Sequence, residues 1–437
     1  MQTRFTPAQL ADPDTAVSEK MIRKCVHCGF CTATCPTYVL LGDELDSPRG
    51  RIYLIKEMLE QDADPTPEVV KHIDRCLSCL ACTTTCPSGV DYAKLIDHAR
   101  DYVEQRYRRP PADRAWRALL AWLLPSRVRF AAAVGLAPLA KPFAPLLARI
   151  PALKPAAAML RLAPHRRRSP VFATFAPAET RGRVLLLRGC AEPVLAPQVR
   201  AATVRLLARM GFEAVFVQGV GCCGSLTHHM GKAEAARAAA RRNIAAWSAE
   251  MARGDVAAIL TTVSGCGVML KDYGHIFRED PALAESAERI SSLAQDITEF
   301  VDRTGLPPAV EHPPLSVAYH AACSLQHGQK ITAAPKRLLM AAGFEVRDIP
   351  EGHLCCGSAG TYNILQSDIA GRLLDRKLEN IDRTDADLIA AGNIGCLTQI
   401  GSGSKRPIVH TIELLDWATG GPAPDQLLPR DGQGFTH

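Results

Sequence analysis

The chain has 437 residues, a formal net charge of +6, and 47% hydrophobic against 22% charged residues. This length accommodates two or three domains, each with its own core, and the composition excludes a disordered or fibrous protein. No apolar signal segment follows Met1, and no uninterrupted apolar run reaches the roughly eighteen residues that predict a membrane-spanning helix. We therefore expect the sixteen cysteines to lie in the reducing cytoplasm, where thiolates bind metals rather than form disulfides.

The positive charge is concentrated in one segment. Between Arg100 and Arg168, fifteen lysines and arginines stand against three acidic residues, so this segment has a charge of +12 and the remainder is near −6. Such asymmetry favours contact with an acidic partner surface, anionic lipid or nucleic acid, and a solvated linker face explains it equally well. Because basic motifs interleaved with aromatic residues are missing from the sequence, we expect no nucleic-acid partner.

The N-terminal region alternates predicted helices with two cysteine runs. Ser47 is a candidate N-cap, with Pro48 at the first helical position, and apolar residues recur after it at helical spacing. The predicted helices are Asp14–Arg23, Ser47–Glu60, Pro67–Arg75 and Tyr92–Arg108.

Residues 25–36 and 76–87 each read C-x2-C-x2-C-x3-C-P. This spacing binds [4Fe–4S] clusters in bacterial-type ferredoxins, where three thiolates bind one cluster and the fourth binds its neighbour. Zinc is the alternative, but zinc sites use pairs of ligands rather than runs of four. We therefore predict an α-helical ferredoxin domain over residues 1–109 that transfers electrons. Its expected ligands are Cys25, Cys28, Cys31 and Cys86 for one [4Fe–4S] cluster, and Cys76, Cys79, Cys82 and Cys35 for the other.

Residues 110–180 form a predicted linker rich in Ala, Leu and Pro, with basic residues interspersed. Trp116–Leu124 reads as a short apolar helix, and the basic run His165–Arg168 ends the segment. Short helices here could pack along a partner, lie in a membrane interface with their arginines reaching the headgroups, or cover the protein's own domains. The prolines expected to break any long helix are Pro125, Pro138, Pro142, Pro145, Pro151 and Pro155.

From Arg183 onward the sequence alternates strands and helices, and the order occurs twice. Cys190 to Cys222 and Cys323 to Cys355 are both 32 positions apart, which indicates a duplicated α/β unit over residues 181–305 and 306–437. The predicted strands are Val184–Leu187, Glu213–Val217, Ala258–Thr262, Ser316–Tyr319, Phe344–Arg347 and Leu388–Ala391. The predicted helices are Gln198–Met210, Lys232–Glu250, Pro335–Ala342 and Ile369–Ile381.

Eight cysteines follow these strands as one C…CC…C set in each unit. They fall at the carboxyl edge of a parallel sheet, where α/β folds bind ligands. They could bind a further metal or iron–sulfur cluster, act as redox dithiols, or be ordinary buried cysteines, and the repeated adjacent pairs favour metal ligation. The two sets are Cys190, Cys222, Cys223 and Cys266, and Cys323, Cys355, Cys356 and Cys396. All sixteen cysteines are then assigned, and none remains for a disulfide.

Other motifs are less informative. Residues 219–224 match G-x-G-x-x-G, but the second unit repeats the cysteines and not the glycines, so we predict no nucleotide site there. His27 is expected to tune or shield a cluster, while His228, His229 and His320 are expected to be hydrogen-bonded polar residues rather than ligands. No arrangement of nucleophile, base and acid is present, so we predict no catalytic residue on this chain.

Several segments resemble the iron–sulfur subunit of glycolate oxidase (glycolate dehydrogenase). They are Cys25–Thr37, Leu41–Leu54, Ser264–Gly267, His353–Tyr362 and Asn393–Cys396, and the resemblance covers nearly the whole chain. It implies a complex in which separate FAD-binding subunits oxidise glycolate to glyoxylate, with no FAD on this chain. This subunit would relay electrons from the flavin to an acceptor, expected to be a quinone, at the inner face of the cytoplasmic membrane.

More distant similarities leave alternatives open. The chain also resembles iron–sulfur subunits of lactate and glycerol-3-phosphate dehydrogenases and of heterodisulfide reductase, all of which share the cysteine-rich "CCG" domain. In heterodisulfide reductase each CCG domain ends in C-x-x-C and binds a non-cubane cluster. The corresponding positions here are Cys266-Gly-Val-Met269 and Cys396-Leu-Thr-Gln399. Each lacks one cysteine, which implies either a four-cysteine cluster or a scaffold without one.

Overall fold

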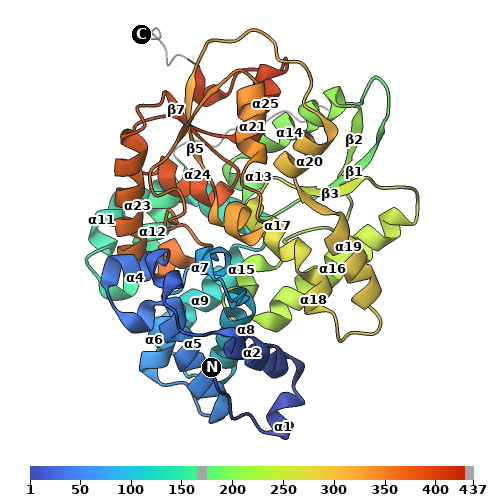
Figure 1. Ribbon diagram of the computed structural model, residues 1–437. Coiled ribbons are helices and arrows are strands. Elements are labelled where there is room, and N and C mark those ends of the chain that lie inside the picture. The colour runs from blue at the N-terminus through green and yellow to red at the C-terminus, as the bar shows by residue number, and fades with distance from the viewer. Residues whose placement is uncertain (165–174, 429–437) are drawn as a thin grey trace.

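The computed structural model describes residues 1–164 and 175–428. Figure 1 shows the N-terminal helices (blue) at the bottom and two α/β units above them, one green to yellow and the other orange to red. The fold is mixed, with a helical N-terminal domain and two parallel sheets, as the sequence predicts. The basic run His165–Arg168 lies outside the described residues.

The N-terminal domain is built from short helices around one apolar core. The Ser47 hydroxyl accepts a hydrogen bond from the Gly50 amide at 3.0 Å, so the predicted cap does begin a helix at Pro48. Ile22, Ile55 and Ile73 are fully buried in the core. The helices are α1 (Pro7–Leu10), α2 (Pro13–Lys24), α3 (Phe30–Ala33), α4 (Pro36–Leu41), η1 (Glu44–Asp46), α5 (Pro48–Glu60), α6 (Pro67–Asp74), α7 (Ala81–Thr85) and α8 (Tyr92–Arg106).

The linker is helical over most of its described length. Its prolines mostly occupy first turns, where their missing N–H has no intrahelical partner, but Pro138 lies inside α10, so the prediction that it ends a helix was wrong. The predicted apolar helix is real and begins earlier, at Pro111. The elements are α9 (Pro111–Leu123), α10 (Arg127–Ala140), η2 (Lys141–Phe143), α11 (Ala144–Leu147), η3 (Pro151–Leu153) and α12 (Lys154–Leu162).

The linker also contains an apolar stretch that the sequence reading missed. Arg127–Leu147 is long and apolar enough to cross a membrane by length and composition alone, and only 17% of its most apolar window is buried. The sequence criterion asked for an uninterrupted apolar run, and the charged residues in this stretch hid it. Core helices of globular proteins pass the same test, so length and composition alone do not establish a membrane span. Because so little of the window is buried, the stretch does form an exposed apolar surface.

The remainder of the described chain contains two four-stranded parallel sheets. Their strand orders, β2-β1-β3-β4 and β6-β5-β7-β8, are equivalent, with Val184 beside Ala258 in one sheet and Val317 beside Leu388 in the other. The strands are β1 (Gly182–Leu186), β2 (Phe212–Val215), β3 (Ala258–Thr261), β4 (Ala294–Asp296), β5 (Ser316–His320), β6 (Glu345–Asp348), β7 (Leu388–Ala391) and β8 (Ile408–His410). The sequence predicted three strands of each sheet; β4 and β8, three residues each, were missed.

Helices cover both sheets. The first unit contains α13 (Glu192–Leu195), α14 (Pro197–Arg209), α15 (Ser225–His228), α16 (Ala233–Met251), α17 (Ser264–Lys271), α18 (Tyr273–Ile276), α19 (Ala284–Leu293) and α20 (Ile297–Thr304). The second contains η4 (Ser324–Gly328), α21 (Ala334–Ala341), α22 (Tyr362–Leu365), α23 (Ser367–Asp382), α24 (Ile394–Gly401), α25 (Thr411–Ala418) and η5 (Asp425–Leu427).

The two units pack against each other through one continuous core. Residues of both sheets, including Leu260 and Leu388, belong to it. The buried Asp416 carboxylate of α25 accepts hydrogen bonds from Arg205 and Arg209 of α14. At the carboxyl edges of the sheets, the Ser264 amide donates to the Gly392 carbonyl. This packing brings the ends of β1, β3, β5 and β7, and the cysteines that follow them, to one region.

Candidate metal centres

The two cysteine runs of the N-terminal domain fold into the same turn. The second and fourth residues after the first cysteine of each run have positive φ: 55° at His27 and 86° at Gly29, 49° at Ser78 and 61° at Leu80. The turn directs backbone N–H groups toward sulfur, and the Ser78 amide donates to the Cys76 Sγ at 3.4 Å. The third cysteine then lies in a short helix, α3 or α7. The fourth follows closely: Cys86 is the C-cap of α7, and Cys35, two residues after α3, is the N-cap of α4.

The structure gathers these eight thiols into two neighbouring groups. A small cavity is bordered by Cys25, Cys28, Cys31 and Cys86, and a second one by Cys35, Cys76, Cys79 and Cys82. The fourth cysteine of each run therefore joins the other run's group, which is the predicted arrangement. Cys82 borders both cavities, so the two groups adjoin. Four thiols around one small cavity are the donor set that a [4Fe–4S] cluster requires, so the residues fit that cofactor.

The two groups differ in exposure. Cys28 is exposed, and Val26 and Phe30 beside it are 68% and 62% exposed. In the second group, burial raises the pKa of Cys79 and Cys82 well above the ordinary thiol value. A buried thiol with a raised pKa releases its proton to solvent readily only when a cation binds the sulfur and compensates the thiolate charge. The first group therefore reaches the surface through Cys28, whereas Cys35, Cys76 and Cys82 of the second group are all buried.

A buried ion-pair network adjoins the second group, and sequence reasoning missed it. Arg51 is 1% exposed and its guanidinium contacts the Cys35 Sγ at 3.9 Å, the His72 carbonyl at 2.7 Å and the Asp46 carboxylate at 3.2 Å. Burial alone would lower the pKa of Arg51, but nearby anionic groups, with Cys76 first among them, raise it above its usual range. Both Arg51 and Asp46 belong to the Leu41–Leu54 segment, where their spacing gave no sign of this contact.

In each α/β unit the four cysteines come together. Side-chain hydrogen bonds connect Cys190, Cys222, Cys223 and Cys266 in series in the first unit. The same series joins Cys323, Cys355, Cys356 and Cys396 in the second. Hydrogen bonds from neighbouring thiols lower the pKa of Cys222, which makes it the most acidic thiol of its set. The topology therefore assembles both predicted sets; whether they bind metal stays a prediction.

Steric contact explains the glycine of each Cys-Cys-Gly sequence. Gly224 and Gly357 have φ values of 94° and 90°, and their amides donate to the sulfur of Cys222 and Cys355, at 3.4 Å in both units. A Cβ atom on Gly357 would lie 2.6 Å from the Ala370 carbonyl oxygen. Only glycine adopts this conformation in that space, so the third residue positions the first cysteine of the pair.

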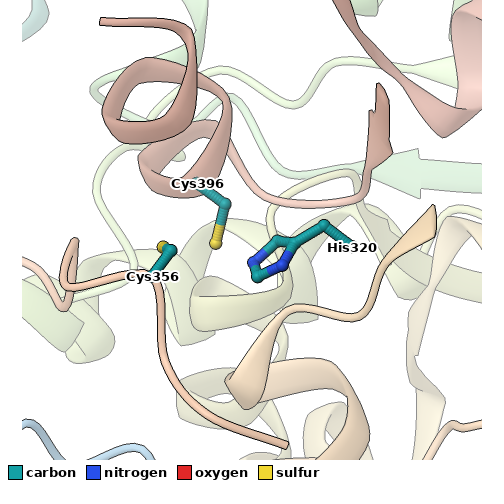
Figure 2. Close-up of side chains that lie close together, drawn as sticks. All are labelled: His320, Cys356 and Cys396. Carbon is teal, nitrogen blue, oxygen red and sulfur yellow. The ribbon is translucent and has the colours of Figure 1, made fainter. Parts of the chain in front are cut away.

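The two sets have different neighbours. His320 ends β5, three residues before Cys323, and Leu187 occupies the matching place before Cys190. Figure 2 shows the His320 ring beside Cys356 and Cys396, and the ligand atoms of all three residues lie within 4.8 Å of one another. Neither ring nitrogen has a hydrogen-bond partner among the described residues, so the prediction of a hydrogen-bonded His320 was wrong. Burial, together with the charge of Lys377, lowers the pKa of His320 to about 3.

Two other histidines near the cysteines are hydrogen-bonded as predicted. His228 and His229 both pair with Asp97 at 3.2 Å, as predicted for satisfied polar residues. Asp97 lies on α8 of the N-terminal domain, so this contact also joins that domain to the first unit. His27 borders the first thiol cavity and its Nε2 lies 2.8 Å from the Met1 Sδ, and its role in tuning or shielding a cluster stays a prediction.

A larger cavity, about 480 Å³, lies between the linker and the cysteines of both units. Cysteines of both sets border it, and so does Cys79 of the N-terminal domain. The linker side is apolar. It is formed by residues of α9, α10 and α12, among them Leu123, Phe130, Val134, Ala137 and Met159. One face of the linker therefore covers the protein's own domains, while the other face is exposed.

Comparisons with known proteins agree with this architecture. A family model described as a 4Fe-4S dicluster domain matches residues 21–90, and the CCG cysteine-rich domain model matches residues 184–271 and 317–401. The chain is 40% identical to the glycolate oxidase iron–sulfur subunit of Escherichia coli (strain K12) over 418 residues, which is 96% of this chain and 99% of the relative. The chain belongs to the family of glycolate oxidase iron–sulfur subunits. As a member of this family it is an iron–sulfur protein, with a dicluster domain followed by a duplicated CCG domain.

Other relatives are more distant from this member of the glycolate oxidase iron–sulfur subunit family. A protein of Bacillus subtilis (strain 168), named as a probable glycolate oxidase iron–sulfur subunit, is 32% identical over 92% of this chain and 95% of its own length. The lactate utilization protein A of Bacillus licheniformis is 32% identical over 54% of this chain and 99% of its own length. A crystal structure of a hypothetical protein from Helicobacter pylori has a TM-score of 0.55 at 10% identity. It covers 95% of this chain and 74% of that chain, and shares the fold alone.

We expect Gly357→Ala to destabilise the protein by about 3 kcal/mol or more, because left-handed backbone strain adds to the clash with Ala370. Gly360→Ala is the matched control: Gly360 also has positive φ, 66°, but nothing lies within 4 Å of its Cβ position. That variant should lose only about 1 kcal/mol. Scanning calorimetry of both variants measures the difference, and equal melting temperatures would contradict the steric explanation.

Proposed function

We propose that this chain is the electron-relay subunit of a glycolate-oxidising complex, in which a separate FAD-binding subunit removes electrons from glycolate. The observation that supports this most strongly is the pair of adjoining four-thiol groups, Cys25, Cys28, Cys31, Cys86 and Cys76, Cys79, Cys82, Cys35. They occur in a chain that aligns over 96% of its length with a glycolate oxidase iron–sulfur subunit. When bound, the two [4Fe–4S] clusters supply reversible one-electron transfer. A flavin that holds two electrons can then transfer them one at a time.

The exposed thiol group is the proposed entry point. Cys28, Val26 and Phe30 present an apolar surface next to the first group, suited to contact a flavoprotein partner. Arg49 borders the same cavity and forms an ion pair with Glu44 at 2.6 Å, which places charged groups at the edge of this surface. The interior cysteines, beside Arg51, would hold the second cluster, which would supply the next one-electron site after the cluster held by the surface cysteines.

Arg51 is expected to set the potential of the interior cluster. Its buried positive charge stabilises the reduced, more negative state, and the negative charge of Asp46 opposes it. Arg51→Met should therefore lower that midpoint potential on the order of 50–100 mV, and Asp46→Asn should raise it. Potentiometric titration followed by electron paramagnetic resonance measures both shifts. Shifts in the same direction would indicate structural damage and contradict the electrostatic assignment.

We also propose a membrane quinone as the electron acceptor, reached at the inner face of the cytoplasmic membrane. Two features support this. The 480 Å³ cavity is apolar on its linker side and reaches the cysteines of both CCG sets, as an apolar redox substrate requires. The outer side of the same linker exposes large apolar side chains next to basic ones, the pattern of a helix that lies in a membrane interface. The exposed residues are Val128, Leu139, Phe143 and Leu146.

Ala137→Trp should reduce quinone-dependent activity, because Ala137 is buried and borders the cavity. We expect about a tenfold or larger loss of kcat/KM with a soluble quinone analogue. Leu139→Trp, on the same helix but 75% exposed, is the matched control and should leave that value unchanged. Glycolate-dependent reduction of a dye by the complex should be normal in both variants. Unchanged quinone reduction in Ala137→Trp would contradict the location of the quinone.

The complex itself tests the proposed function. An affinity-tagged chain at its native expression level should co-purify with FAD-containing subunits and give glycolate-dependent dye reduction. Cys28→Ala should lower iron and acid-labile sulfide by about four atoms each per chain, since one cluster loses a ligand. It should also slow electron delivery to quinone. Recovery of the chain without flavoprotein partners, or partners that oxidise lactate and not glycolate, would refute the assignment.

A further inference from the structure

The second CCG unit contains a histidine positioned differently from every other buried histidine near the sheets. His320 is 1% exposed, and Cys356 and Cys396 beside it are 1% and 5% exposed. Cys356 follows β6, His320 ends β5 and Cys396 follows β7. These three strands are neighbours in one sheet, in the order β6, β5, β7. Figure 2 shows the imidazole directed at the two sulfurs. Adjacent parallel strands thus deliver one nitrogen and two sulfur ligands to one point.

Neither ring nitrogen of His320 has a hydrogen-bond partner among the described residues. His410, at the end of β8 in the same sheet, shows the usual arrangement. Its Nε2 lies 2.8 Å from the Thr262 carbonyl oxygen, and its Nδ1 accepts from the Ile412 amide at 3.1 Å. Buried imidazoles normally make such bonds, so an unpartnered one that faces two thiols is the arrangement of a metal ligand.

The first unit lacks this arrangement. Leu187 stands where His320 does, and Asn243 stands where α23 has Lys377. The neutral side-chain amide of Asn243 donates a hydrogen bond to the Cys222 carbonyl at 2.9 Å. Lys377 is 2% exposed, and its ammonium donates to the Glu351 carbonyl at 3.1 Å. The second unit therefore provides both an additional ligand and a buried lysine where the first unit has an amide.

We propose that the second CCG unit binds an iron–sulfur centre for which His320 is a ligand together with cysteines of its set, and that the first unit has no such ligand. Thiolates with an imidazole suit iron–sulfur centres and zinc alike. Cys79 packs in the same apolar cluster as Cys323 and Cys355, so the interior group of the N-terminal domain adjoins this site. The preference for iron over zinc rests on the proposed relay function. The choice of His320, Cys356 and Cys396 as ligands rests on their geometry and is independent of that function.

The test uses the full chain, purified anaerobically and supplied with ferrous iron and sulfide. Pulsed electron paramagnetic resonance of protein labelled with 15N-histidine should detect a nitrogen coupled to a reduced centre. His320→Leu, which introduces the residue of the first unit, should abolish that coupling and lower iron by up to about four atoms per chain. His229→Leu is the control: His229 borders the 480 Å³ cavity that cysteines of both sets line, but it pairs with Asp97, and its loss should change neither reading.

A second variant distinguishes loss of the nitrogen ligand from loss of folding. His320→Cys keeps a ligand and should retain iron while losing the nitrogen coupling. Unchanged iron and coupling in His320→Leu, or no histidine coupling in the unaltered chain, would overturn the proposal. One zinc per chain in place of iron would overturn the iron–sulfur assignment. None of these measurements uses glycolate or a partner, so a failure here is distinct from a failure of the proposed function.

Discussion

The structure depends on holding sixteen thiols in four groups, with backbone N–H groups directed at sulfur. Left-handed residues make this possible. Ser78 in a cysteine run, and Gly224 and Gly357 after the cysteine pairs, each place an amide 3.4 Å from a sulfur atom. These donors favour the thiolate, whereas burial favours the neutral thiol. The balance makes each group receptive to a cationic centre, and the helices and sheets serve to bring such turns together.

The arrangement of the groups suggests a direction for the proposed relay. An exposed group beside Val26 and Phe30 adjoins an interior one, and Cys79 of the interior group packs with Cys323 and Cys355 of the second α/β unit. The apolar cavity under the linker borders that unit's cysteines as well. Entry from a protein partner and exit to an apolar acceptor would then occur on different surfaces, which keeps the two partners from competing for one site.

Duplication gave this chain two equivalent sheets, but the cysteine sets at their edges have diverged. The backbone features are shared: equal strand orders, equal spacing from first cysteine to pair, and a left-handed glycine after each pair. The side chains around them differ, with Leu187 and Asn243 in one unit and His320 and Lys377 in the other. The same four thiols therefore have different side chains around them in the two units.

The sequence alone determined the helical N-terminal domain, the duplicated parallel α/β units and the grouping of all sixteen cysteines. Fixed spacing within a turn or after a strand fixes where a side chain lies locally. Two expectations were wrong, for Pro138 and for His320, and the exposed apolar stretch Arg127–Leu147 and the three-residue strands β4 and β8 were missed. The contact of Arg51 with Cys35, the unpartnered ring of His320 and the cavity beneath the linker were decided only by tertiary structure. They join segments distant along the chain, and their geometry comes from packing between domains, which no local pattern encodes.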